Sequence, residues 1–217
     1  SLQTSCTPCV LEGTALITGG TGELGRALAR HLVTAHRVRH LILTSRSGMQ
    51  AADQDDLVKG LVAAGAESVR VLPCDVTQRA QVEAALAAAD AAHPISSVFH
   101  LAGVLDDGLI ERQSAERLTQ VFAPKVLGAL HLDQLTRGLK LQAFVVFSSA
   151  AGTIGASGQG VYGAANLFLD ELVSSRHRAG QPGKSLAWGL WKQMGIGMTA
   201  HLGKVELQRL RRQGVVP

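Results

Sequence analysis

Four side chains in the second half of the chain are of types that can transfer a proton together: Tyr162, Ser149, Lys125 and Asn166. A tyrosine has a pKa of about 10, so it is protonated at neutral pH and can act as an acid. A nearby lysine ammonium would stabilise the phenolate and lower that pKa, and a serine hydroxyl can donate a second hydrogen bond to an oxygen that gains negative charge. Asn166 follows Tyr162 by four residues, so both share a helix face, where Asn166 can orient Lys125 or a water molecule. These residues predict general-acid catalysis.

Each of the four also has a purely structural interpretation. Tyr162 is the only tyrosine and could be a packed core residue, and Ser149 could cap a helix. Lys125 could be a surface charge and Asn166 a helix end. The catalytic interpretation is favoured because a ligand-binding motif precedes all four in the chain.

A glycine-rich turn near the start of the chain has the pattern of a phosphate-binding loop. The segment Thr18–Gly25 reads Gly-x-Gly-x-x-Gly from Gly20, follows an apolar run and opens a helical pattern at Glu23. Glycines allow a tight turn and a close approach of the backbone to a pyrophosphate, while the helix N-terminus supplies free N–H groups. We therefore expect a dinucleotide here, in contact with Thr18, Gly19, Gly20, Thr21, Gly22, Leu24 and Gly25.

The residues after the second predicted strand indicate which dinucleotide binds. An NAD site would carry an acidic residue about 20 residues after the glycines, to hold the ribose hydroxyls. This chain has Ser45, Arg46 and Ser47 there, and no acid. Arg46 can bind a 2′-phosphate with two parallel hydrogen bonds, while Ser45 or Ser47 donates another. NADPH is therefore favoured over the alternative, a surface arginine in a loop.

Two further pairs of residues belong to this site by position. Asp75 and Val76 follow the third predicted strand, where a carboxylate can meet the adenine amino group, and Ala102 and Gly103 follow the fourth, where small residues let the ribose lie close. Ligands of open α/β sheets bind in a crevice at the carboxyl ends of the strands. Together the pairs trace one such crevice.

The elements that would position these residues alternate along the chain. Short apolar runs predict strands at Thr14–Thr18, His40–Thr44, Ser68–Pro73, Ile95–Leu101, Leu141–Phe147 and Lys184–Trp188. Amphipathic stretches predict helices at Glu23–Ala35, Gln54–Ala64, Gln78–Ala92, Glu111–Arg137 and Gln159–Arg178. Strands that are apolar throughout are typical of a parallel sheet covered on both faces. The predicted fold is α/β, a doubly wound, Rossmann-like parallel sheet with helices on both faces.

Local signals mark some element ends. We expect Thr77 to cap the helix that begins at Gln78, and Gly180 with Pro182 to end the helix that carries Tyr162. Cys74 ends an apolar run and is expected in the core.

The composition fits one soluble domain, since 46% of the 217 residues are apolar and 18% are charged. No signal peptide opens the chain and no apolar run approaches the length of about 20 residues that spans a bilayer, so we expect a cytoplasmic protein without a membrane partner. Basic residues are not interleaved with aromatic ones, which argues against nucleic acid. Cys6 and Cys9 lack the further ligands of a metal site. We assign 1–12 to a linker remnant and 13–217 to one catalytic domain, with a lid at about 189–212.

The glycine turn, Ser149 at a strand end and Tyr162 thirteen positions later together resemble the short-chain dehydrogenase/reductase family. Most members have the pattern Tyr-x-x-x-Lys, whereas this chain has Asn166 in the place of that lysine. Lys125 lies on the preceding long helix, where ordinary members carry asparagine. This exchange is similar to the ketoreductase domains of modular polyketide synthases and animal-type fatty-acid synthases. Further segments agree with that resemblance: Leu16–Gly20, His100–Asp107, Phe147–Gly152 and Trp188–Trp191.

The resemblance implies an NADPH-dependent oxidoreductase that reduces a β-ketoacyl thioester, carried on an acyl carrier protein, to the β-hydroxyacyl thioester in polyketide biosynthesis. It also implies other domains of the same synthase as partners, including a structural subdomain that this chain lacks. Carrier proteins are generally acidic, so the basic cluster Arg209–Arg212 is compatible with docking one; a solvated helix face is the alternative. Two other functions stay open: a non-catalytic NADP-binding structural or sensor module, and an independent 3-oxoacyl-carrier-protein reductase.

The resemblance further implies a stereochemical type. Leu105-Asp106-Asp107 marks the B type, which gives a D-oriented, usually 3R, hydroxyl; a solvated turn is the alternative. The A type instead carries a tryptophan at the position of Thr153. Ala156 and Gly160 lack the proline and asparagine of domains that reduce an epimerised substrate, which makes the chain B1-like. The expected substrate contacts and stereocontrol residues are Leu105, Asp106, Asp107, Gln159 and Met194.

Overall fold

The structure is a computed structural model that describes residues 10–155 and 157–189. The expectations for Cys6, Cys9, Ala156, Met194 and Arg209–Arg212 therefore lie outside the described residues, as does the expected lid beyond Gly189. The chain forms two compact units. The first unit comprises Ser1–Ala102 and Leu130–Phe144, and the second unit comprises Gly103–Ala129 and Val145–Pro217.

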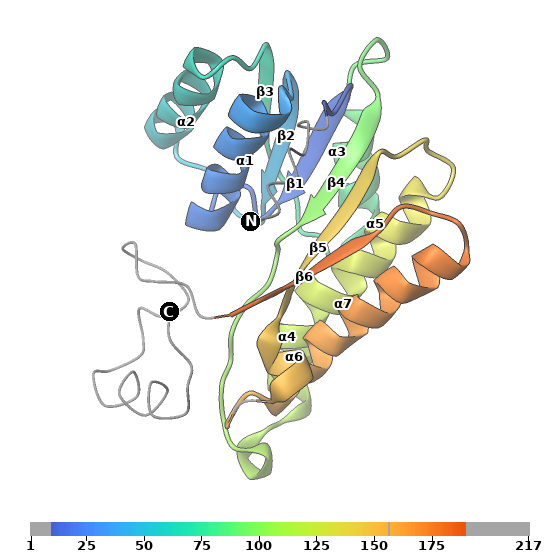
Figure 1. Cartoon of the computed structure of the whole chain (residues 1–217). Coiled ribbons are helices and arrows are strands. Elements are labelled where there is room, and N and C mark those ends of the chain that lie inside the picture. The colour runs from blue at the N-terminus through green and yellow to red at the C-terminus, as the bar shows by residue number, and fades with distance from the viewer. Residues whose placement is uncertain (1–9, 156, 190–217) are drawn as a thin grey trace, which may run out of the picture. The chain divides into compact units, whose positions relative to one another are not determined.

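Parallel strands form the centre of the first unit. Their order is β3-β2-β1-β4, with the bounds β1 Thr14–Thr18, β2 His40–Ser45, β3 Ser68–Pro73 and β4 Ile95–His100. Every residue of β1 and β4 is buried, while β3 at the edge is only partly covered. Helices α1 Glu23–His36, α2 Ala51–Ala63 and α3 Arg79–Ala87 connect the strands, and Figure 1 shows α1 in front of them and α3 behind. The predicted doubly wound sheet with helices on both faces is confirmed.

The strand β5, Ala143–Ser149, starts in the first unit and continues in the second. At its start the backbone N–H of Gln142 donates to the carbonyl of Ser96 at 2.7 Å. In the second unit β5 pairs in parallel with β6, Lys184–Trp188, so the hydrogen-bonded order of all described strands is β3-β2-β1-β4-β5-β6. The carboxyl end of β5 places Ser149 at the start of the next helix.

The helical segment between β4 and β5 is less regular than the sequence indicated. The single helix expected over Glu111–Arg137 is confirmed in part. A 3₁₀ turn, η1 Ile110–Arg112, comes first, and helical residues then run without a break through helix α4 Ala115–Phe122, a π-helical turn η2 Ala123–Leu127 and helix α5 Gly128–Thr136. Ser114 starts α4 afresh by accepting a hydrogen bond from the N–H of Arg117 at 3.3 Å, and Pro124 has no N–H to continue the α-helical pattern.

Two other helix ends also differ from prediction. Helix α3 stops at Ala87 rather than Ala92, because the Asp90 carboxylate accepts the N–H of Ala92 at 2.8 Å and forms a local turn. The predicted cap by Thr77 is wrong, since α3 has no side-chain cap and the Thr77 N–H instead donates to Asp75 at 2.9 Å.

Other expectations about local structure hold. Helix α6, Ala150–Ile154, is followed by the long helix α7, Gly160–Arg178. Helix α7 ends before Gly180, whose backbone is left-handed with a φ of 69°. Cys74 is buried, as predicted. None of the described helices is long and apolar enough to cross a membrane.

Candidate active site

Tyr162 lies in the first turns of α7 and is buried in an apolar cluster of the second unit. Its side chain is 4% exposed and packs with Val121 of α4 and Ala165 of α7, with Leu105 against them. The core-residue interpretation is therefore correct as a description of packing. It leaves open what the hydroxyl does, which depends on the neighbouring polar groups.

Lys125 is buried beside this tyrosine, not exposed as a surface charge. The π-helical turn η2 carries it, its side chain is 5% exposed, and Nζ lies 5.3 Å from the centre of the Tyr162 ring. Nζ donates to the carbonyl of Phe147 in β5 at 3.0 Å. Burial lowers the pKa of Lys125 from 10.5 to about 8, against an opposing effect of the Asp170 carboxylate. The ammonium is thus mostly charged at neutral pH and its surroundings disfavour that charge.

Gly103 leaves room for this lysine. A Cβ at Gly103 would lie 3.0 Å from Cε and 3.3 Å from Cγ of Lys125. The segment after β4, predicted to contact a cofactor ribose, therefore also borders the lysine side chain.

Ser149 ends β5 and caps α6. Its Oγ accepts a hydrogen bond from the N–H of Ala151 at 3.2 Å, so the capping interpretation is confirmed. Acceptance uses a lone pair and leaves the hydroxyl proton available for donation. The cap fixes the serine without excluding the predicted chemical role.

Asn166 is fully buried on α7, one turn after Tyr162, and is no helix end because α7 continues to Arg178. Its Nδ2 donates to the backbone carbonyl of Tyr162 at 2.7 Å, which fixes the amide plane. Its Oδ1 is buried and has no hydrogen-bond partner among the residues that the structure describes. Burying a carbonyl oxygen without a hydrogen bond is unfavourable, so this oxygen is suited to accept one from a bound group such as a water molecule.

The pKa of the Tyr162 hydroxyl is raised above its ordinary value of 10.0. Burial is the main cause, while side-chain hydrogen bonds with Asn166 and Ser149 act in the opposite direction and the Asp107 carboxylate adds to the rise. The lowering expected from the Lys125 ammonium together with a bound oxidised nicotinamide stays a prediction, since burial dominates the pKa shift in the protein alone. Tyr162 therefore holds its proton firmly, as a general acid must before the reaction.

The Leu105-Asp106-Asp107 segment is fixed in the second unit. Arg117 of α4 forms an ion pair with Asp106 at 2.5 Å, and Gln159 donates to Asp107 at 2.9 Å. The hydrogen bond from Arg117 lowers the pKa of Asp106 below its usual value. Of the two residues for which a solvated turn was the alternative, Asp106 is 24% exposed and ion-paired, whereas Asp107 is exposed.

The glycine turn of the first unit has the shape that a pyrophosphate needs. Gly19 has a φ of 68°, and a Cβ at Gly20 would lie 2.8 Å from the Ile17 carbonyl oxygen. A Cβ at Gly25 would lie 2.4 Å from the Gly19 carbonyl oxygen, so only glycine lets α1 pack this closely on the turn. Gly22 begins α1 without a side-chain cap, which leaves backbone N–H groups for a ligand. These residues fit a dinucleotide.

Thr18 and His100 join this turn to the segment after β4. The Thr18 hydroxyl lies 2.8 Å from His100 Nδ1 and accepts from the N–H groups of Leu101 and Ala102 at 3.2 and 3.3 Å. Thr18 is 1% exposed, so its side chain holds two backbone segments in place. Of the other turn residues, Thr21 accepts the Arg26 guanidinium through its carbonyl and Leu24 is half-buried.

The two other predicted cofactor segments follow β2 and β3. Arg46 and Ser47 are exposed, whereas the Ser45 hydroxyl donates to the carbonyl of Gly48 at 2.8 Å and so shapes this loop. Asp75 is half-buried and accepts the Thr77 N–H through one oxygen, which leaves the other for an amino group. Val76 is buried.

Comparison with known proteins shows where this arrangement occurs. Residues 13–193 match the family model described as "KR domain". The chain belongs to the KR domain family. Most of the chain, including all four candidate catalytic residues, falls within the matched region.

The regions that match this KR domain are segments of much larger proteins. It is 51% identical over 204 residues to the spectinabilin polyketide synthase system protein NorB of Streptomyces orinoci. This match covers 94% of the chain and 9% of that protein. It is 48% identical over 204 residues to the mycoketide-CoA synthase of Mycobacterium tuberculosis (strain ATCC 25618 / H37Rv), 94% of the chain and 5% of that synthase. The chain thus spans less than a tenth of the length of these relatives.

Solved structures share the fold of the KR domain. A structure titled "Structure of A-type Ketoreductases from Modular Polyketide Synthase" superposes with a TM-score of 0.88 at 36% identity, over 98% of this chain and 44% of that one. "The first ketoreductase of the tylosin PKS" superposes with a TM-score of 0.83 at 44% identity, over 94% of this chain and 44% of that one.

The structure of this KR domain brings Tyr162, Ser149, Lys125 and Asn166 together in the second unit, and it adds residues that the sequence did not single out. These are His100, which contacts Thr18; Asp170, whose charge acts on Lys125; and Arg117, which pairs with Asp106. No spacing signal marked them, because each contact joins separate elements.

Proposed function

We propose that this KR domain reduces a β-ketoacyl thioester to the β-hydroxyacyl thioester, with NADPH as the hydride donor. The observation that carries the proposal is the burial of Lys125 beside the Tyr162 ring, at 5.3 Å, with Ser149 and Asn166 in the same unit. Burying an ammonium is costly and shifts its pKa, which is typical of catalytic sites.

Each of the four side chains has a distinct task in this reaction. The Tyr162 hydroxyl donates its proton to the ketone oxygen as that oxygen gains negative charge, and Ser149 donates a second hydrogen bond to the same oxygen. The Lys125 ammonium stabilises the phenolate that remains. Asn166, held by the Tyr162 carbonyl, offers Oδ1 to a water or to the lysine. When bound, the nicotinamide supplies the hydride.

NADPH would be held by residues of the first unit. The glycine turn suits the pyrophosphate, the Asp75 carboxylate suits the adenine amino group, and the exposed Arg46 suits the 2′-phosphate.

Replacing Arg46 tests the choice of cofactor. Arg46→Ala is expected to raise the Kd for NADPH about 10- to 100-fold, from the loss of hydrogen bonds to a charged phosphate, and to leave the Kd for NADH almost unchanged. Fluorescence titration with both nucleotides measures this. Arg30→Ala, at an exposed arginine of α1, is the matched control and should change neither value. Equal weakening of both nucleotides would count against the 2′-phosphate contact.

The stereochemistry that we propose is of the B type and B1-like, with a D-oriented (3R) hydroxyl. Leu105-Asp106-Asp107 and the absence of tryptophan at Thr153 support it. Leu105 packs on the Tyr162 cluster and Gln159, which contacts Asp107, precedes Tyr162 by three residues. The segment that marks the type is therefore next to the proposed acid.

The substrate is proposed to arrive on an acyl carrier protein, and other domains of the same synthase are the proposed neighbours. The relatives are polyketide synthases of which this chain spans 9% or less in the two cases above, which supports a place in such an assembly. Cytoplasmic location belongs to the same proposal.

One reaction tests the whole proposal. The protein is incubated with NADPH and a racemic 2-methyl-3-ketoacyl thioester, NADPH oxidation is followed, and the alcohol is separated on a chiral column. We expect turnover, a mainly 3R product, and a loss of about 10²- to 10⁴-fold in kcat for Tyr162→Phe. Binding of NADPH without turnover would indicate a cofactor-binding module, and a mainly 3S alcohol would overturn the B-type proposal.

A further inference from the structure

One arginine of the second unit holds the segment that runs from β4 to α4. The Arg117 guanidinium meets the Asp106 carboxylate with two parallel hydrogen bonds, Nε to Oδ2 at 2.6 Å and Nη2 to Oδ1 at 2.5 Å. The two side chains are 33% and 24% exposed. This is the bidentate geometry that arginine provides and lysine cannot.

The same guanidinium also binds two backbone carbonyls that follow Asp106 in the chain. Nη2 donates to the carbonyl of Asp107 at 3.1 Å, and Nη1 donates to the carbonyl of Arg112 at 3.2 Å. The Arg117 N–H is itself capped by Ser114. One side chain thus fixes a carboxylate and two carbonyls to the first turn of α4.

Gly108 makes this arrangement possible. A Cβ there would lie 3.1 Å from both Nη1 and Nη2 of Arg117 and 3.1 Å from Nε2 of Gln113. These are closer than ordinary contacts, so any larger residue would displace the guanidinium.

The far side of the segment is attached to the loop before the proposed acid. The Gly108 N–H donates to the carbonyl of Gly158 at 2.8 Å, and Gln159 Nε2 donates to Asp107 Oδ2 at 2.9 Å. Leu105 packs against the cluster that contains Tyr162. A shift of Asp106 would therefore be transmitted to Leu105, to Asp107 and to the loop that leads into α7.

We propose that Arg117 is a positioning residue that sets which face of the substrate ketone meets Tyr162, by holding Leu105–Gly108 in one conformation. The inference rests on the proposed ketone reduction. In this proposal Arg117, which lies outside Leu105–Gly108, determines the stereochemical effect of that segment. Ion pairs that solvent still reaches, as at 33% and 24% exposure, contribute little to global stability. The effect is therefore expected in the product ratio more than in the unfolding free energy.

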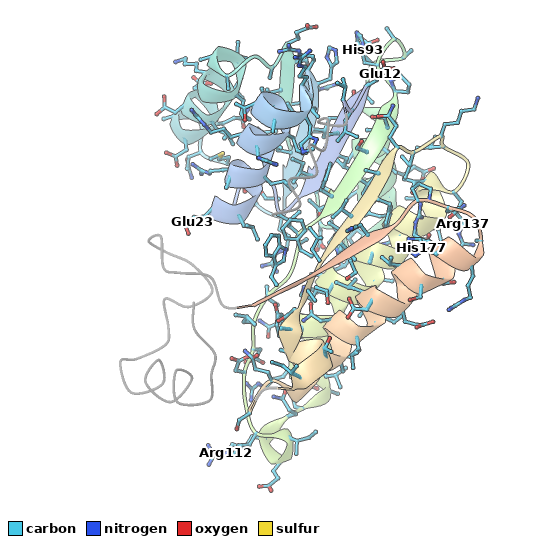
Figure 2. The ribbon with its side chains drawn as sticks, viewed as in Figure 1. Glu12, Glu23, His93, Arg112, Arg137 and His177 are labelled. Carbon is cyan, nitrogen blue, oxygen red and sulfur yellow. The ribbon has the colours of Figure 1, made fainter. Side chains whose placement is uncertain are left out.

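The test compares three variants with the wild type. Arg117→Lys keeps the charge and loses the fork, Arg117→Ala loses both, and Gly108→Ala keeps the arginine but displaces it. Arg112→Ala is the matched control, because its side chain is exposed and points outward from η1 while its carbonyl stays in place (Figure 2).

With NADPH and a 3-ketoacyl thioester, we expect each of the three variants to raise the fraction of the minor alcohol at least about fivefold. Their kcat/KM should fall about 10- to 100-fold, as small displacements of a reacting pair do, while the Kd for NADPH stays within about twofold. Arg112→Ala should match the wild type in all three measurements. Arg117→Lys is informative even if Arg117→Ala folds poorly, since it retains the positive charge.

The outcomes separate this inference from the proposed function. If the wild type fails to reduce the thioester, the proposed function is wrong. If the wild type reduces it and the variants lose only thermal stability, with an unchanged ratio of alcohols, Arg117 has a structural role and the inference is wrong.

Discussion

Lys125 is a charged residue in an environment that disfavours its charge. Its ammonium is buried on a π-helical turn and donates to the carbonyl of Phe147 at 3.0 Å. Burial lowers its pKa to about 8 and raises that of Tyr162. Burial thus favours the neutral form of both groups: Lys125 loses its proton more readily, and Tyr162 keeps its own.

The rate of ketone reduction should therefore depend on the charge of Lys125. Its ammonium is present below a pKa of about 8 and is lost above it, while Tyr162 remains protonated over that range. We expect kcat to be level below about pH 8 and to fall by up to about tenfold per pH unit above it. Measuring kcat from about pH 6 to about pH 10 tests this, and Lys125→Met should lower kcat and remove the inflection. A wild-type profile that stays flat through this range would contradict the assignment.

The same burial should lower the stability of the folded protein. Between the folded pKa of about 8 and the ordinary value of 10.5, the unfolded chain binds more protons, so the free energy of unfolding rises with pH in that window. We expect Lys125→Met to raise this free energy by about 1–3 kcal/mol near pH 7, after the loss of the Phe147 hydrogen bond, and by much less near pH 10.5. Urea unfolding of both proteins at the two pH values measures it. A variant that is less stable near neutral pH would show that the ammonium is well solvated in the fold.

At the scale of elements, close contacts between a helix and the turn before it shape the proposed cofactor site. Gly25 in α1 has the Gly19 carbonyl where a Cβ would stand, at 2.4 Å, whereas Gly60 in α2 has nothing within 4 Å of that position. The two glycines are both helical and differ in their surroundings. They form a matched pair for testing what this contact contributes.

We predict opposite effects for alanine at these two positions. Gly25→Ala should lower the free energy of unfolding by at least about 2 kcal/mol and weaken NADPH binding, because α1 must move away from the turn. Gly60→Ala should raise that free energy by about 0.5–1 kcal/mol, from the lower entropy of the unfolded chain, with unchanged binding. Urea unfolding and NADPH titration give both numbers. Similar stabilities for the two variants would mean that α1 does not pack on the turn as described.

At the scale of the whole molecule, a net charge of +4 and a pI near 9.3 distinguish this chain from the acidic carrier proteins that it is proposed to meet. Charges of opposite sign speed encounter and stabilise weak complexes, and salt screens both effects. The basic cluster Arg209–Arg212 lies outside the described residues, so its part in such an encounter rests on sequence.

Salt should therefore change the two kinds of substrate differently. Between about 0.05 M and about 0.5 M salt, we expect the KM for a carrier-bound β-ketoacyl substrate to rise several-fold and the KM for a free thioester to stay nearly constant. The double variant Arg211→Glu/Arg212→Glu should raise the first KM at low salt and remove most of its salt dependence. Unchanged affinity of this variant for the carrier protein would exclude the cluster as a docking surface.

The order of elements, the parallel sheet and the glycine turn could all be predicted from the sequence, because they depend on local patterns. Apolar runs and amphipathic periods fall where the strands and most helices form. The turn needs glycine at Gly19, Gly20 and Gly25, because residues close in the chain leave no room for a Cβ there or impose a left-handed backbone. Tyr162 and Asn166 share a helix face by spacing alone. Residue type and a resemblance pointed to Lys125.

Only the tertiary structure decided the charge states and the partners of these residues. The π-helical turn that carries Lys125 lies inside a helical stretch that periodicity predicted as regular, and it contains Pro124, which has no N–H for the α-helical hydrogen bond. The raised pKa of Tyr162 and the contacts of Arg117 with Asp106 come from elements that fold against each other. Desolvation and hydrogen bonds between distant segments depend on three-dimensional distance, which sequence spacing does not encode.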